Sequence, residues 1–379
     1  MENFIAYNPT SLHFGKNILN DLGATINKYG NRVLLVYGKN SIKQNGLYNL
    51  IRSQLDKINA QVFEYNGIKS NPIVEDVDGA AALGRKHNVD VILAVGGGSV
   101  IDSAKMIAIT IPYQVKAWDY FTRVAAAPTT AIPMVAVLTL AATGSEMNPF
   151  AVISNHKAEV KGSYTSPLMF PKHSFLDPQF TASVPYNYTA YGIADLIAHC
   201  LEAYFGKGEA TLADRFVFSI IKEALENGPA LLKDLTNYDL RARIMFAATM
   251  ALNGMTMQGR ASGEWGVHSI GHILSLLYDV PHGASLTIVY PAWLKLQKHR
   301  LADRISYLGQ NVFNTSDVDL TIERLESFFR LMDCPVRLSE EVENFNSEEI
   351  IRIMIQNKAA TFVHKMDHND YKKVVELMS

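Results

Sequence analysis

The first 140 residues alternate between short apolar segments and segments of helical periodicity. Four buried strands are expected, at residues 31–37, 61–65, 89–95 and 133–140, and an opening strand is expected within residues 4–14. Helical spacing occurs between them, at residues 18–29, 47–58, 74–87 and 100–109. Strands that are joined through helices run parallel, and the helices cover both faces of their sheet. The alternation therefore predicts a Rossmann-like α/β domain.

Strand-like segments nearly disappear after residue 177, and long helical patterns replace them. Helices are expected at residues 188–204, 214–228, 239–254, 267–277 and 283–298, and residues 311–379 add further helices. A chain of 379 residues is too long for one typical core. We therefore expect an α/β domain at residues 1–182, followed by an all-α domain at residues 183–379.

The charge balance excludes two classes of partner. The chain has 35 Lys and Arg against 37 Asp and Glu, a net charge of −2. Such a balance offers no large basic surface for nucleic acid or for an anionic membrane. The two cysteines, Cys200 and Cys334, form no disulfide framework, and no secretory signal or membrane-spanning run is visible. A cytoplasmic enzyme is expected.

A glycine loop follows the third expected strand. Gly96, Gly97, Gly98 and Ser99 lie between that strand and a helix. Glycines allow close approach of the backbone, and the N–H groups at a helix N-terminus suit a phosphate. A triple glycine also occurs in plain tight turns, and its spacing is not the usual dinucleotide fingerprint. Its place between strand and helix favours phosphate binding at the carboxyl edge of the sheet.

The loop at residues 37–41 indicates which dinucleotide is preferred. An acidic residue at the end of such a strand would bind the ribose hydroxyls of NAD(H) and repel a 2′-phosphate. No acid is present, and Lys39, Asn40 and Ser41 can all donate hydrogen bonds. The loop therefore predicts a preference for NADP(H) over NAD(H), although an exposed polar turn has the same composition.

Two pairs of metal-ligating residues occur at helical spacing in the second half. Asp195 and His199 are four residues apart, as are His268 and His272, and His282 follows Pro281. Residues four apart lie on one face of a helix. A single histidine in an apolar segment is usually a core residue, but several buried imidazoles and a carboxylate need partners. One shared divalent cation, Fe(II) or Zn(II), would satisfy them. Cys200 is set aside as a ligand because adjacent helical residues point about 100° apart.

These motifs together resemble the iron-containing (group III) alcohol dehydrogenase family, in its branch of butanol dehydrogenases and NADPH-dependent aldehyde reductases. The resemblance covers essentially the whole chain. It rests on the glycine loop with Asp102 and Lys105, on Leu138-Thr139-Leu140 with Thr143-Gly144-Ser145-Glu146, and on Asp195, His199, His268, His272 and His282.

The resemblance implies a nucleotide-binding first domain and a metal-binding helical domain, with catalysis between them. It implies that Asp195, His199, His268 and His282 are the metal ligands, and that His272 lies near the nicotinamide and the substrate. It also implies cofactor contacts, at Gly38, Ser41, Asn71, Gly96, Gly97, Gly98, Ser99, Asp102, Thr139, Thr143 and Lys161. Glycine at position 38 agrees with use of NADP(H). A homodimer is expected from the same resemblance.

The expected reaction is hydride transfer between NADP(H) and small aldehydes or primary alcohols of the butanol type. The cation would polarise the carbonyl oxygen, and His272 would relay a proton or only pack beside the site. An NAD-dependent polyol dehydrogenase is the alternative. A lyase resembling dehydroquinate synthase and a non-enzymatic NADP(H) sensor are less favoured, because the first would need a different ligand set and the second has no use for a metal cage.

Overall fold

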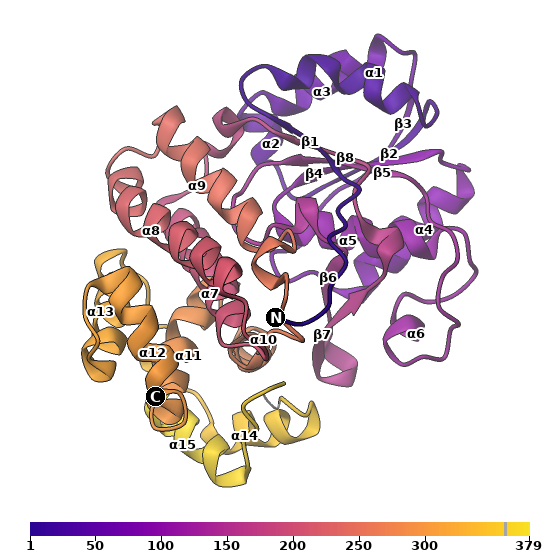
Figure 1. Ribbon diagram of the computed structural model, residues 1–379. Coiled ribbons are helices and arrows are strands. Elements are labelled where there is room, and N and C mark those ends of the chain that lie inside the picture. The colour runs from indigo at the N-terminus through magenta and orange to yellow at the C-terminus, as the bar shows by residue number, and fades with distance from the viewer. Residues whose placement is uncertain (360–361) are drawn as a thin grey trace. The chain divides into compact units, whose positions relative to one another are not determined.

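The computed structural model describes residues 1–359 and 362–379, which form two compact units (Figure 1). The α/β unit consists of Tyr7–Val184 and Leu235–Thr249. The helical unit consists of Met1–Ala6, Pro185–Asp234 and Met250–Ser379, apart from residues 360–361, which belong to the expected all-α region and lie outside the described residues. The domain boundary expected after residue 182 would instead place Met1–Ala6 in the α/β unit and Leu235–Thr249 in the helical unit. Helical periodicity alone does not reveal which core a segment packs against.

The α/β unit is built on a sheet of six parallel strands. Its strands are β1 (Ser11–Phe14), β2 (Arg32–Tyr37), β3 (Gln61–Tyr65), β4 (Val91–Gly96), β5 (Met134–Leu138) and β8 (His173–Leu176). Their order across the sheet is β1-β8-β5-β4-β2-β3, and every pairing is parallel. The predicted parallel α/β architecture is therefore confirmed. The expected opening strand forms only over Ser11–Phe14.

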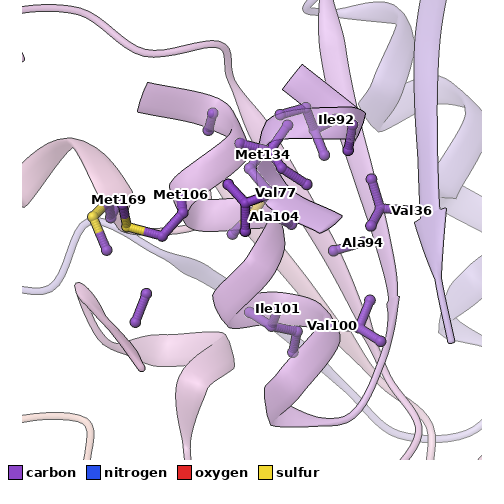
Figure 2. Packing of buried hydrophobic residues seen from close by; sticks show 14 of the residues in the cluster. Val36, Val77, Ile92, Ala94, Val100, Ile101, Ala104, Met106, Met134 and Met169 are labelled. Carbon is purple, nitrogen blue, oxygen red and sulfur yellow. The ribbon is translucent and has the colours of Figure 1, made fainter. Parts of the chain in front are cut away.

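Helices cover both faces of this sheet, as Figure 1 shows. Alternate residues of β2 serve opposite cores: Val33 and Leu35 pack with α1 (Leu22–Asn27) and α3 (Leu47–Asp56), whereas Leu34 and Val36 face α4 (Val74–Lys86) and α5 (Gly98–Thr110). Figure 2 shows the second core, in which Val36, Ile92 and Ala94 of the strands pack with Val77 of α4 and Ala104 of α5. A strand that is buried on both faces needs a continuous apolar sequence, which explains the pattern in β2 and β4.

An antiparallel hairpin of β6 (Phe150–Asn155) and β7 (Val160–Thr165) follows β5 and was not expected from the sequence. Its second strand is polar and partly exposed, so the usual apolar alternation is weak. The hairpin is held to the rest of the unit by hydrogen bonds from Val152 N to Asp102 Oδ2 (2.8 Å) and from Ser154 N to Pro72 O (2.8 Å).

The helical unit is organised around α11 (His282–Gln297), of which the stretch from Gly283 to Leu294 is buried. Helices α7 (Tyr186–Tyr204), α10 (Gly266–Tyr278), α13 (Val318–Leu331) and α15 (His368–Met378) pack around it. The remaining helices of this unit are α8 (Thr211–Lys233), α12 (Ala302–Leu308) and α14 (Ser347–Gln356). Most of α9 (Tyr238–Ala251) belongs to the α/β unit. No helix in the described part of the chain is both long enough and apolar enough to cross a membrane.

Candidate metal and cofactor sites

Two glycines let three helices approach closely enough to bring the predicted metal ligands together. A Cβ on Gly283 would lie 2.2 Å from the carbonyl oxygen of Tyr191, one turn before Asp195 on α7. A Cβ on Gly271 would lie 2.7 Å from Ser285 Oγ. Real side chains do not tolerate such distances, so the backbone of α11 at Gly283 packs against the backbone of α7, and the backbone of α10 at Gly271 packs against the Ser285 side chain of α11. The first turn of α11 is thereby fixed against both of the other ligand-bearing helices.

The carboxylate of Asp195 lies at the centre of the resulting cluster. Its Oδ1 atom is 3.4 Å from His199 Nδ1, 3.7 Å from His268 Nε2 and 3.6 Å from His282 Nε2. Tetrahedral bonds of about 2.0–2.2 Å place neighbouring ligand atoms about 3.3–3.6 Å apart. Donor atoms of Asp195, His268 and His282 all lie within 4.8 Å of one another, and His199 adjoins this group through Asp195. The spacing therefore fits a mixed oxygen and nitrogen metal site.

Burial makes the cluster unfavourable without a shared cation. Asp195 is 1% exposed and His199 is 4% exposed. Within the described residues, Asp195 Oδ1, His199 Nδ1 and His268 Nε2 have no hydrogen-bond partner. Buried polar atoms in this state cost free energy of about 1–3 kcal/mol each. Several lone pairs that converge on one point without a proton donor are the donor chemistry that a divalent cation needs.

The charges in the cluster perturb the pKa of each member. Burial lowers the pKa of His199 to about 4, although Asp195 opposes this change. Burial also disfavours the charged form of His268, but the carboxylates of Asp195 and Glu202, the second of which is hydrogen-bonded to Nδ1, outweigh burial and raise the pKa of His268 to about 9. Burial would raise the pKa of Asp195, yet His199, His282 and His268 hold it well below its ordinary value. Asp195 is therefore an anionic centre.

Sequence analysis missed two residues beside the cluster. Glu202 is fully buried, and its Oε1 atom accepts hydrogen bonds from Nδ1 (2.9 Å) and backbone N (3.0 Å) of His268. Trp265 precedes α10 with a left-handed φ of 58°, and its ring centroid lies 5.5 Å from that of His268 and 6.3 Å from that of His199. Glu202 could have been found, because it continues the Asp195 and His199 face of α7 by one further turn.

The two other candidates near the cluster differ in position. His272 is half-buried on α10, with its ring centroid 5.5 Å from that of His282 and 6.4 Å from that of His268. It is adjacent to the cluster but not one of the three residues with mutually close donor atoms. Cys200 is fully buried, and burial raises the pKa of its thiol far above the ordinary value, which disfavours the thiolate that metals bind.

The α/β unit places the predicted cofactor loops at one edge of its sheet. Strand β2 is flanked by β3 on one side and β4 on the other, so the strand order reverses between β2 and β4. Ligands bind at such switch points, outside the carboxyl ends of the strands. Tyr37 is in register with Val95, and Gly96 with Leu138, so Gly38, Gly97 and Thr139 follow neighbouring strand ends. These three loops therefore begin at neighbouring positions along the carboxyl edge of the sheet.

The glycine loop leads directly into α5. Gly97 precedes the helix in an extended conformation, and a Cβ on Gly98 would lie 2.4 Å from Thr143 Oγ1. The two loops that carry Gly98 and Thr143 are therefore in contact. Ser99 donates a hydrogen bond from Oγ to Ser70 O, which ties the helix start to the loop after β3. Helix geometry gives the N–H groups of Gly98 and Ser99 no acceptor within α5, so they suit a phosphate, whereas those of Val100 and Ile101 donate to Gly97 O.

Asp102 has protein partners in this structure. Its Oδ1 atom accepts a hydrogen bond from Ser145 Oγ (2.5 Å) and its Oδ2 atom accepts one from Val152 N (2.8 Å). Lys105 is fully buried and donates from Nζ to Ser145 Oγ, Asn148 Oδ1 and Phe150 O. Burial lowers the pKa of Lys105 to about 8, although Asp102 and Glu146 oppose this. These contacts fix the segment after β5.

The other predicted cofactor residues flank the same strand ends. Ser41 begins the short helix α2 (Ser41–Gln44), and Lys161 of β7 donates from Nζ to Asn71 Oδ1 (2.8 Å). Lys39, Asn40 and Ser41 are exposed. The neighbouring acid Glu64 accepts hydrogen bonds from the hydroxyls of Tyr37 (2.8 Å) and Tyr48 (2.7 Å). Its oxygens are thus directed at tyrosines, and the loop itself presents donors.

Comparisons with known proteins agree with this combination of sites. The family described as iron-containing alcohol dehydrogenase matches residues 9–178, and its C-terminal counterpart, the Fe-containing alcohol dehydrogenase family, matches residues 189–378. The chain belongs to the iron-containing alcohol dehydrogenase family. The resemblance to its butanol dehydrogenase and aldehyde reductase branch is likewise confirmed by the relatives described next.

Similar members of the family differ in the cofactor that they are named for. The probable NADH-dependent butanol dehydrogenase 2 of Bacillus subtilis is 42% identical over 90% of this chain and 89% of the relative. The NADPH-dependent aldehyde reductase YqhD of Escherichia coli is 36% identical over the same shares. A crystal structure of NADH-dependent butanol dehydrogenase A of Thermotoga maritima has a TM-score of 0.96 and 33% identity, covering 100% of this chain and 99% of that one.

The helix contact at Gly283 is testable through one added methyl group. Gly283→Ala should push α11 away from Tyr191 and lower the free energy of unfolding by about 1–3 kcal/mol. Metal affinity should fall with it, because His282 begins that helix. Thermal unfolding and metal titration measure both effects. Gly162→Ala makes the same change where the nearest atoms lie at 3.6 Å and should alter neither property; a variant of Gly283 that matched Gly162→Ala would contradict this reading.

Proposed function

We propose that this chain is a metal-dependent alcohol dehydrogenase and aldehyde reductase that transfers hydride between NADP(H) and small aldehydes or primary alcohols. One observation carries the proposal: Asp195 Oδ1 is surrounded by three imidazole nitrogens at 3.4–3.7 Å in a buried cluster. Membership of the iron-containing alcohol dehydrogenase family supports it. The relatives named butanol dehydrogenase and aldehyde reductase support the choice of small aldehydes and alcohols.

The metal would be held by Asp195, His199, His268 and His282, with Fe(II) or Zn(II) both compatible with these ligands. When bound, a divalent metal would supply Lewis-acid chemistry, by withdrawing electron density from the substrate carbonyl. The residues themselves contribute the anionic charge of Asp195 and the imidazole nitrogens of the three histidines. The low pKa of His199, about 4, keeps this side chain neutral near pH 7 and therefore able to donate a lone pair.

The cofactor would be held by the loops at the carboxyl edge of the sheet. The start of α5 would receive the pyrophosphate, because Gly97 and Gly98 leave its N–H groups uncovered by side chains. Gly38, Ser41, Asn71, Asp102, Thr139, Thr143 and Lys161 would line the remainder. Lys39 and Ser41 would bind the 2′-phosphate, which gives the preference for NADP(H).

His272 would act as the proton relay for the substrate oxygen. It is half-buried and packs beside His282, so one ring face adjoins the proposed ligands. An imidazole is the side chain best suited to give and take a proton near neutral pH. We also propose a cytoplasmic homodimer without nucleic-acid or membrane partners. The charge balance supports the absence of nucleic-acid and membrane partners, and the two buried free cysteines support a cytoplasmic location. The family resemblance supports the homodimer.

Metal removal and one ligand substitution test the proposed reaction. We expect the protein to oxidise NADPH with butanal, to lose this activity when a chelator strips the metal, and to regain it with Fe(II) or Zn(II). His268→Ala should lose both metal and activity, whereas His299→Ala, an exposed histidine of the same unit, should keep both. A metal-loaded and active His268→Ala variant would refute the ligand assignment. Faster turnover of glycerol with NAD than of butanal with NADPH would favour the polyol alternative.

The cofactor preference depends on the charge at the end of β2. The wild-type kcat/KM should be higher with NADPH than with NADH. Lys39→Ala should lower the NADPH value about tenfold, equivalent to about 1.4 kcal/mol, and leave the NADH value nearly unchanged. Lys86→Ala removes an exposed lysine from the C-terminal end of α4 and should change neither kcat/KM value. Equal or better use of NADH by the wild type would overturn the preference.

The role of His272 is tested by its pH dependence. His272→Ala should lower kcat by about 100-fold or more, because general acid catalysis typically contributes that much. The limb of the pH–rate profile that reports His272 should disappear, while metal content stays unchanged. If kcat stays within a few fold of the wild type across the pH range, His272 only packs beside the site.

A further inference from the structure

Glu202 continues the metal-facing side of α7, because Asp195, His199 and Glu202 are separated by four and then three residues. We infer that Glu202 is a positioning residue, which fixes the ring orientation and tautomer of His268 so that Nε2 is presented to a metal ion. This inference rests on the proposed function, since it concerns the same site. Glu202 itself would not contact the metal, because its bonded oxygen faces the opposite nitrogen of the ring.

The hydrogen bonds define which nitrogen of His268 carries the proton. The backbone N–H of His268 can only donate, so Glu202 Oε1 acts as an acceptor at 3.0 Å. The same oxygen lies 2.9 Å from Nδ1 of the ring. An oxygen that accepts both bonds requires the proton to be on Nδ1, which leaves the lone pair of a neutral ring on Nε2. That atom lies 3.7 Å from Asp195 Oδ1.

The same two bonds also restrict rotation of the ring. One holds the backbone of the first turn of α10, and the other holds the ring of the same residue, so backbone and side chain of His268 share one anchor. Trp265 packs edge-on against the ring, with centroids 5.5 Å apart. Carboxylates that orient ligating histidines typically change metal affinity by 10–100-fold when they are removed.

A second buried acid gives a matched control. Glu264 is also fully buried, and its Oε2 atom accepts hydrogen bonds from Val363 N and His364 N, both at 3.0 Å. Within the part of the chain that the structure describes, the hydrogen bonds of its carboxyl group go to this backbone segment and not to a proposed ligand, while its backbone N donates to Glu202 O (2.9 Å). Substitution of Glu264 by Gln thus changes a buried carboxyl group to an amide without touching His268.

Metal exchange with Co(II) tests the inference without relying on turnover. Affinity is measured by chelator competition, the coordination geometry by the visible absorption of Co(II), and folding by the Tm of the metal-free protein. Glu202→Leu should bind Co(II) 10–100-fold more weakly, with an altered spectrum. Glu202→Gln, whose amide oxygen can still accept, should recover part of the affinity. Glu264→Gln should keep the wild-type affinity and spectrum.

The outcomes separate a positioning role from a structural one. If Glu202→Leu binds Co(II) with wild-type affinity and spectrum, the inference is wrong, whatever its effect on Tm. If Glu202→Leu does not fold, Glu202→Ala, which also removes the acceptor, decides in the same way. If Glu264→Gln weakens binding as much as Glu202→Gln, the effect belongs to buried charge in general and the inference also fails. A wild-type protein that binds no Co(II) would instead refute the proposed metal site.

Discussion

The organisation of the helical unit depends on the burial of the Asp195 carboxylate. A buried carboxylate without compensation is strongly unfavourable, and the three imidazoles at 3.4–3.7 Å are the groups that surround it. Bringing imidazoles from α10 and α11 to one atom of α7 requires helix approaches that only glycine permits, at Gly271 and Gly283. Ligand geometry and helix packing are therefore one constraint in this unit, and a change in either alters the other.

Lys105 of the α/β unit is also a buried charged residue, but its hydrogen bonds are satisfied by the protein. Its three Nζ contacts, to Ser145, Asn148 and Phe150, use the full donor capacity of an ammonium group. A cation that is satisfied in this way stabilises structure and has nothing left to offer a ligand. In the Asp195 cluster, lone pairs remain without donors among the described residues. The state of the hydrogen bonds, and not burial alone, thus separates a structural charge from a candidate binding site.

The sequence predicts those features that repeat along the chain. Strands buried on both faces and helices with residue pairs four apart have a local period, so the parallel sheet and the two helical pairs, Asp195 with His199 and His268 with His272, could be recognised. The hairpin of β6 and β7 could not, because its polar second strand lacks an apolar face. The packing of Leu235–Thr249 with the α/β unit depends on contacts distant in sequence. Glu202 has the correct spacing, but only the structure shows that its carboxylate contacts His268.

The proposed metal-site and cofactor-site residues differ in how freely they can change. Asp195, His199 and Glu202 are nearly inaccessible and lie in packed helices, where substitutions disturb the core. Lys39, Asn40 and Ser41 are exposed in a loop, where substitutions usually change stability by no more than about 0.5 kcal/mol. Cofactor preference can therefore change while the fold and the metal cluster persist. This difference gives a physical reason why similar family members are named for NADH in one case and NADPH in another.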